Sequence, residues 1–243
     1  MNTDPKRVIA LWSAPRSRST AFLRMMMERD DIVALHEPFC QLADFGTCTV
    51  ADREVKSEPE LIAAIKDLGT ESRVFFKDTT DFRYPGVLAD AEFLREVEHT
   101  FIIRHPREVI PSHFAMNPNV TLPEIGFSRL YELYLAVAAA TGREPIVVDS
   151  DLLLEQPEPT VRAYNERVGL THRPDTLNWS AGMPQEWSKT ARWHAEAGNS
   201  NGFVKSEKAY ENTVENHPVL ADFYEQEMPF YEYLLERRMK VGP

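Results

Sequence analysis

The residues best suited to chemistry are two arginines and three hydroxyl residues in five consecutive positions: Arg16, Ser17, Arg18, Ser19 and Thr20. Guanidinium and hydroxyl groups donate hydrogen bonds to phosphate and sulfate oxygens. An apolar run at residues 8–12 precedes them, and apolar residues from Phe22 to Met26 follow at helical spacing. A strand, a tight loop and a helix N-terminus present backbone N–H groups to an anion. We therefore expect a phosphate or sulfate site here, although an ordinary turn with solvated arginines would share this composition.

A second candidate pair is Arg104 and Ser112, which lie eight positions apart. Arg104 follows an apolar strand at 99–103, and Ser112 falls on the predicted helix after it, so the two side chains can converge on one phosphate. Alternatively, Arg104 pairs with a surface carboxylate and Ser112 faces solvent. The G-x-x-x-x-G-K-[ST] signature of nucleoside-triphosphate sites is absent from the chain.

The order of predicted elements places these residues at one edge of a sheet. Strands alternate with helices from residue 7 to 170, which predicts the α/β class, with a central parallel sheet covered by helices on both faces. Ligands of such sheets bind beyond the carboxyl ends of the strands. Four predicted strands exit into polar clusters: 13–20, 36–39, 77–81 and 104–112.

Other segments carry weaker signals. Residues 40–57 are polar and irregular, which predicts a surface loop. A helix that begins near Glu58 is expected to stop at Gly69, and a C-terminal helix over 218–235 is expected to break near Pro229. Residues 171–217 hold three of the four tryptophans and a polar, glycine-marked run, which favours a lid or binding loop. We expect a single domain over residues 1–243.

Composition limits the function classes. The 243 residues carry a formal net charge of −11, which opposes binding to nucleic acid and to anionic membranes. The N-terminus does not resemble a signal peptide, and no apolar run is long enough to span a membrane. Two cysteines, with no His/Cys spacing typical of zinc, favour a reduced, cytoplasmic setting and no metal. The oligomeric state is not set by the sequence, so a homodimer stays open.

Two motifs resemble those of a known family. SAPRSRSTAF at 13–22 is similar to the 5′-phosphosulfate loop of the sulfotransferases that use 3′-phosphoadenylyl sulfate, most closely the bacterial small-molecule branch. FIIRHPREVIPSHF at 101–114 resembles their 3′-phosphate motif. The resemblance implies a P-loop-like three-layer fold without a metal. It also implies sulfuryl transfer to a hydroxyl, less favourably an amine, of a small molecule, leaving adenosine 3′,5′-bisphosphate (PAP).

The same resemblance assigns roles to residues. Arg16, Ser17, Arg18, Ser19 and Thr20 would hold the 5′-phosphosulfate, and Arg104 and Ser112 the 3′-phosphate. Arg16 would also neutralise charge on the bridging oxygen as the sulfuryl group leaves. Gly202 and Phe203, in a basic segment over 189–205, would cover the adenosine. Ala21 occupies the position of the adenine-stacking tryptophan of the animal enzymes, so Phe203 or Trp193 would stack instead.

Transfer to a hydroxyl also needs a group that accepts its proton. The animal cytosolic enzymes place a histidine two residues after a strand lysine, but that position, counted from Lys77, is Thr79. Other branches use a glutamate after the first helix, which favours Glu37 as the base, with His36 as its alternative or partner. Glu37 could instead pair structurally with Arg16 or Arg18. Lys77 would bind the transferred group.

Three further histidines, His105, His113 and His194, are expected to be structural or solvated.

The sequence also leaves two other functions open. A kinase-like phosphotransferase on a P-loop scaffold would need ATP and Mg²⁺, which the missing glycine-lysine signature disfavours. A non-catalytic nucleotide-binding protein would explain Thr79 in place of the usual histidine.

Overall fold

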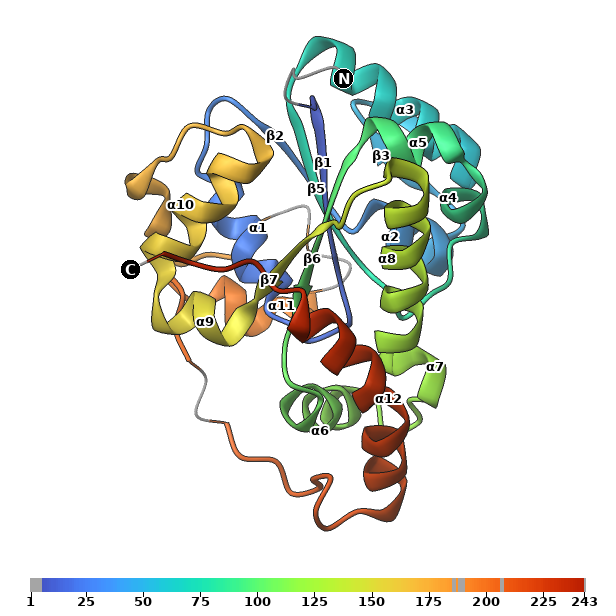
Figure 1. The fold of residues 1–243 in the computed structure, drawn as a ribbon, viewed down its shortest axis with the longest axis vertical. Helices are drawn as coiled ribbons and strands as arrows, with labels where there is room; N and C mark the ends of the chain where they lie inside the picture. Colours follow the sequence, from blue (N-terminus) through green and yellow to red (C-terminus); the bar gives the residue numbers. More distant parts are fainter. Residues whose placement is uncertain (1–5, 185–186, 188–190, 206–207, 243) are drawn as a thin grey trace.

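The structure, a computed structural model, describes residues 6–184, 187, 191–205 and 208–242. A five-stranded parallel sheet lies at its centre, in the order β2-β5-β1-β6-β7 (Figure 1). Its strands are β1 (Val8–Ser13), β2 (Val33–His36), β5 (Val74–Thr79), β6 (Glu98–Ile103) and β7 (Ile146–Asp149). Ser13 lies opposite both Thr79 and Ile102, so the three central strands end close together.

Helices cover both faces of the sheet (Figure 1). One face carries α1 (Ser19–Met27), α9 (Ser150–Glu155) and α10 (Pro157–Val168). The other face carries α2 (Pro38–Phe45), α3 (Glu58–Glu71), α4 (Pro85–Ala89), α5 (Ala91–Glu96) and α8 (Phe127–Thr141). Three more helices pack near the end where the strands finish: α6 (Pro106–Met116), α7 (Leu122–Ile125) and α12 (Pro218–Glu236). No described helix combines the length and the apolar character needed to cross a bilayer.

Strand β1 is buried on both sides because its residues alternate between two cores. Val8, Ala10 and Trp12 belong to the core under α3 and α8, whereas Ile9 and Leu11 belong to the core under α1 and α10. A strand buried on both faces reads as a continuous apolar run, which is why the sequence predicted it. The parallel α/β sheet with two covered faces is confirmed.

The predicted surface loop over 40–57 is wrong. The segment contains the rest of α2 and a hairpin of β3 (Cys48–Val50) and β4 (Arg53–Val55). A carboxylate distant in sequence stabilises the start of α2, because Asp78 accepts hydrogen bonds from the backbone N–H groups of Phe39 (2.6 Å) and Cys40 (3.1 Å). The hairpin turns at Ala51-Asp52, without a glycine.

Two predicted helix interruptions are also wrong. Helix α3 continues through Gly69 to Glu71, and Gly69 is needed for close packing, since a Cβ there would lie 2.6 Å from Val8 Cγ2. Helix α12 continues through Pro229. The expected loop over 171–217 contains a 3₁₀ turn, η1 (Pro174–Leu177), and a helix, α11 (Ala191–Gly198). Residues 185–186, 188–190 and 206–207 of that segment lie outside the described residues.

Candidate functional site

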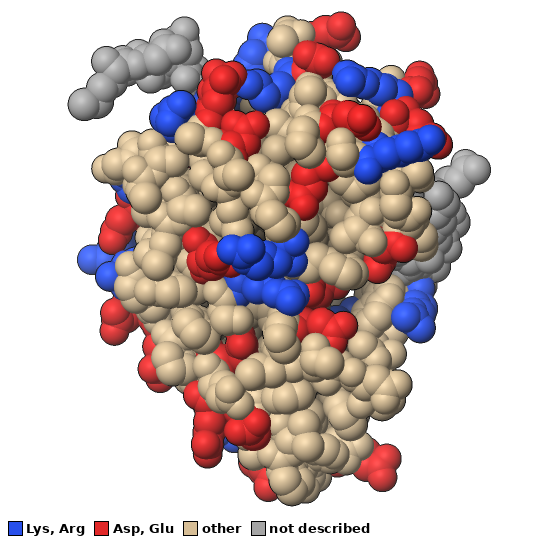
Figure 2. Space-filling model, turned by 90° about the vertical axis from the view of Figure 1, so that its right-hand side faces the viewer, with Lys and Arg blue, Asp and Glu red and all other residues tan. Residues whose placement is uncertain are grey.

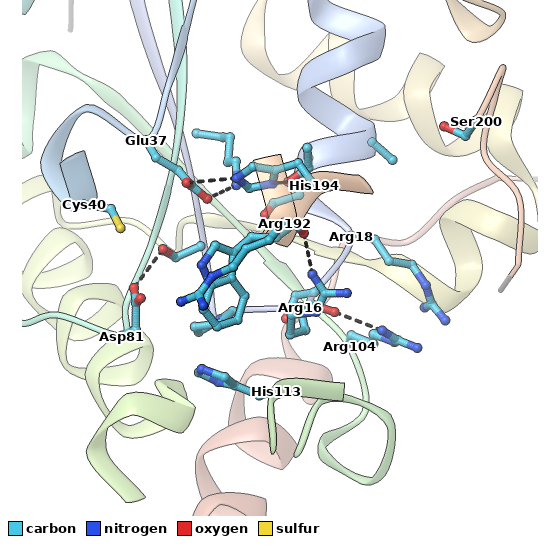
Figure 3. A pocket seen from close by; sticks show the side chains of 18 of the residues that line it. Arg16, Arg18, Glu37, Cys40, Asp81, Arg104, His113, Arg192, His194 and Ser200 are labelled. Atoms are coloured by element: carbon cyan, nitrogen blue, oxygen red, sulfur yellow. Dashed lines mark hydrogen bonds and ion pairs between the residues drawn. The ribbon is translucent and has the colours of Figure 1, made fainter. Parts of the chain in front are cut away.

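A cavity of about 740 Å³ opens where β1, β2, β5 and β6 end, within the usual size range of small-ligand sites (Figure 3). Most of the predicted site residues line it: Arg16, Ser17, Arg18, Ser19, Thr20, Glu37, Lys77, Arg104 and Gly202. His36, Ser112 and Phe203 do not. The chain is acidic overall, yet the cavity lining includes six basic residues: Arg16, Arg18, Lys77, Arg104, Arg192 and Lys205. Figure 2 shows how acidic and basic side chains are distributed over one face of the molecule.

Three cavity residues hold a strained backbone. Arg16, Arg18 and Glu37 have φ values of 64°, 66° and 49°, in the left-handed region that favours glycine. The other non-glycine residues with positive φ in the described chain are the two at the β3–β4 turn. Such conformations cost of order 1–3 kcal/mol each and cluster at functional sites. The strain therefore points to the loop before α1 and to the start of α2 as the working parts of the cavity.

The loop before α1 has the chemistry of an anion cradle. Ser17 is fully buried, and its Oγ has no hydrogen-bond partner. Ser19 begins α1, and its Oγ accepts a hydrogen bond from Ser13 Oγ at 2.9 Å. A buried hydroxyl without a partner is costly, and an anionic oxygen at the helix N-terminus would satisfy it.

One carboxylate orients two arginines of the cradle. Glu108 Oε2 accepts hydrogen bonds from Arg104 Nε (2.9 Å) and from Arg18 Nη2 (2.8 Å). Arg104 Nη1 also donates to the carbonyl oxygen of Arg16 at 3.0 Å, and Arg18 pairs with Asp151 on α9. Both guanidinium groups are thereby held at the cavity wall (Figure 3).

Arg16 connects the loop to two other elements. Its Nε donates to Ser112 Oγ on α6 at 3.0 Å, and its Nη1 donates to the carbonyl oxygen of Trp193 on α11 at 2.6 Å. Ser112, predicted to act beside Arg104, is 1% exposed and contacts Arg16 in this structure. Its role in holding a phosphate stays a prediction.

Glu37 lies at the centre of a buried charged cluster, just before α2. The Lys77 ammonium contacts Glu37 Oε1, while His194 Nε2 and His36 Nε2 lie 3.4 and 3.6 Å from Oε2. Burial alone would raise the pKa of Glu37, but Lys77 and the two histidines hold it well below its usual value. Burial lowers the pKa of both His36 and His194. The ion-pair partner of Glu37 is therefore Lys77 rather than Arg16 or Arg18.

His194 is a site residue that the sequence did not reveal. It reaches the cavity from α11, and its Nδ1 lies 3.2 Å from Thr20 Oγ1. It thus connects the loop hydroxyls to Glu37 (Figure 3). The only signal was its place in a tryptophan-rich segment, which indicated a lid but no contact. In the described residues, His36, Glu37 and His194 also form the one group whose spacing could hold a metal ion.

The two residues predicted to cover the adenosine, Gly202 and Phe203, lie in different places. Gly202 lines the cavity. The Phe203 ring packs instead in the core under α1 and α10, with its centroid 5.3 Å from that of Trp179 and 6.5 Å from that of Phe22. Trp193 lines the cavity instead. Position 189, where the predicted segment begins, lies outside the described residues.

Comparison with known proteins identifies a family for this chain. Residues 6–238 match the model of a family described as a sulfotransferase domain. Two curated Arabidopsis thaliana relatives, branched-chain-amino-acid aminotransferase-like proteins 2 and 1, are each 30% identical to this chain across 93% of its length. The match covers 41% of each relative, so the chain spans about two-fifths of their length.

Solved structures of low similarity include two sulfotransferases. One, from Alicyclobacillus acidocaldarius, is 14% identical with a TM-score of 0.48, and the match covers 80% of this chain and 93% of that one. The other, a mouse sulfotransferase complexed with PAP, is 12% identical with a TM-score of 0.45, and the match covers 97% and 86%.

Proposed function

This chain belongs to the sulfotransferase family, and from that membership we propose that it moves a sulfuryl group from 3′-phosphoadenylyl sulfate to a hydroxyl of a small molecule. One observation carries the proposal. A single cavity holds an anion cradle with strained arginines at one end and an ionised, buried glutamate, Glu37, beside it. An activated anionic donor and a nucleophile that must lose a proton need this combination.

The donor supplies an activated sulfuryl group, whose sulfur–oxygen bond to phosphate breaks as a bond to the acceptor oxygen forms. Arg16, Ser17 and the N–H groups at the start of α1 would bind the phosphosulfate. Arg104 would bind the 3′-phosphate, and Arg16 would stabilise the charge that develops on the departing phosphate oxygen. Arg104 lies beside Arg16, because its side chain donates a hydrogen bond to the carbonyl oxygen of Arg16, and this placement supports the division.

Glu37 would accept the proton of the acceptor hydroxyl. Its lowered pKa keeps the carboxylate ionised and able to accept a proton, although the same lowering makes it a weaker base. Lys77, 1% exposed and in contact with Glu37, is a positioning residue in this account, and His194 aligns the second carboxylate oxygen. Lys77 already supplies positive charge to Glu37. We therefore propose that His36, Glu37 and His194 act in the reaction without binding a metal ion.

The proposal is tested by measuring PAP release from 3′-phosphoadenylyl sulfate with a panel of small alcohols. Glu37→Gln should lower kcat by at least about 100-fold, as expected for loss of a general base, while PAP binding is retained. Glu71→Gln, which neutralises an exposed carboxylate at the end of α3, is the matched control. Dialysis against a chelator should leave the rate unchanged. Full turnover in Glu37→Gln would refute the assigned base.

A further inference from the structure

The two ends of the cavity differ in charge. Arg18, Arg104 and Lys205 line the end that we assign to the donor. The opposite end is lined by three carboxylates: Asp44 of α2, Asp81 after β5 and Glu124 of α7. Figure 3 shows Arg18 and Arg104 on one side of the cavity and Glu37, Cys40 and Asp81 on the other. This acidic end is where an acceptor would lie.

The three carboxylates form no ion pair with any residue that the structure describes. Asp81 accepts a hydrogen bond from Thr79 Oγ1 at 2.8 Å. Glu124 binds the start of its own helix at Thr121, and Asp44 lies 3.8 Å from the Cys40 thiol. Burial, together with repulsion from Glu37 and Asp44, raises the pKa of Asp81 to about 6. Negative charge is therefore concentrated here, with Arg129 and Arg192 as the arginines whose charge acts on Glu124 and Asp44. By contrast, Glu108 at the basic end holds two arginines.

A buried, unpartnered histidine at the same end also points to a ligand. His113 is 4% exposed, lines the cavity, and has no hydrogen-bond partner for Nδ1 (Figure 3). Burial, with the charge of Arg16, lowers the pKa of His113 to about 4, so the imidazole is uncharged at neutral pH. It can bind a polar ligand without adding positive charge that would repel a cation.

The chain itself places a cation toward this end. The Arg192 guanidinium stacks on the Trp193 ring, 4.9 Å from its centroid, and lies in the middle of the cavity (Figure 3). Its charge lowers the pKa of Asp44, although burial has the larger, opposite effect. Arg192 is exposed and α11 carries it, so it can move aside for a ligand of the same charge.

We propose that the acceptor is a small amino alcohol, whose ammonium group is held by Asp81 and its acidic neighbours while its hydroxyl faces Glu37. The inference rests on the proposed sulfotransfer. A protonated ammonium has no lone pair, so the hydroxyl oxygen attacks sulfur. The oxygen–sulfur bond forms, the sulfur–oxygen bond to phosphate breaks, and the hydroxyl proton passes to Glu37. The product is a zwitterionic sulfate ester.

The experiment compares acceptors that differ only in charge. Amino alcohols from two to six carbons are each matched with a neutral alcohol and with a hydroxy acid of equal length, and kcat/KM is measured by PAP release. We expect a preference for the amino alcohol of about 10- to 100-fold, the size of a hydrogen bond to a charged group. Asp81→Asn should remove most of it, whereas Asp67→Asn, which neutralises an exposed carboxylate on α3, should not.

Three results would overturn the inference without touching the proposed sulfotransfer. Neutral alcohols that are used equally well would show that charge plays no part. Better use of the hydroxy acids would assign acceptor binding to Arg192. PAP binding without turnover on any amino alcohol would reject this acceptor class while leaving the sulfotransfer proposal standing. Failure to bind PAP would instead reject the proposed function, and this inference with it.

Discussion

Removing one partner of the Lys77–Glu37 ion pair should destabilise the protein strongly. Their side chains are 1% and 7% exposed, so Lys77→Met or Glu37→Gln leaves a buried charge without its partner. Such losses cost about 3–5 kcal/mol, and the lower end applies because Glu37 borders a cavity that water can enter. For a chain of this size, about 3 kcal/mol corresponds to a fall in Tm of about 6–12 °C.

The double variant Lys77→Met/Glu37→Gln separates charge from packing. With both charges removed, we expect stability within about 1 kcal/mol of wild type in urea unfolding. The pKa of Glu37 is lower folded than unfolded, so its contribution is present above the ordinary glutamate pKa and is lost as pH falls through the folded value. The wild-type advantage over Glu37→Gln should therefore shrink below about pH 4. A double variant as unstable as either single variant would refute the reasoning.

Three further changes test separate parts of the molecule. Gly69→Ala should cost about 1–3 kcal/mol in urea unfolding, because the new Cβ would lie 2.6 Å from Val8 Cγ2. Gly126→Ala should lower Tm and weaken PAP binding, because φ is +93° there and the Cβ would lie 3.0 Å from Pro15 Cδ, beside the cradle. The pKa of Asp81 is raised to about 6, so the KM of an amino alcohol should rise as pH falls through 6, and Asp81→Asn should flatten that profile. Asp81→Asn should be at least as stable as wild type at pH 8, since ionising a group whose folded pKa is raised costs stability as pH rises.

The sequence predicted the sheet and the place of the cavity because both depend on local patterns. Strand β1 is an unbroken apolar run, and parallel strands bring their carboxyl ends, with Arg16 and Glu37, to one edge. Helix α2 was missed because it is short and its first N–H groups are bound by Asp78, 38 positions from Cys40. A pattern read over a short stretch of sequence cannot reveal a contact between residues so far apart.

The contacts of His194 and Ser112 were missed for the same reason. His194 lies more than 150 positions from Glu37, and the docking of α11, with Arg16 bonded to Trp193 and Thr20 beside His194, brings it close. Likewise, Ser112 on α6 was expected beside Arg104, just after β6, from their spacing in the sequence, but its hydroxyl accepts a hydrogen bond from Arg16. Spacing predicts which residues share an element, whereas side-chain pairing across elements depends on how those elements pack.

The most direct test of the central claim is calorimetric titration with PAP and, separately, with Mg-ATP. Wild type should bind PAP tightly and ATP weakly. Arg104→Ala should weaken PAP binding by about 10- to 150-fold, equivalent to a charge-assisted hydrogen bond of about 1.5–3 kcal/mol. Arg107→Ala, which removes an exposed arginine in the first turn of α6, three positions after Arg104, should change it by no more than about twofold. Preferred binding of ATP, unaffected by Arg104→Ala, would contradict the account and support a phosphotransferase instead.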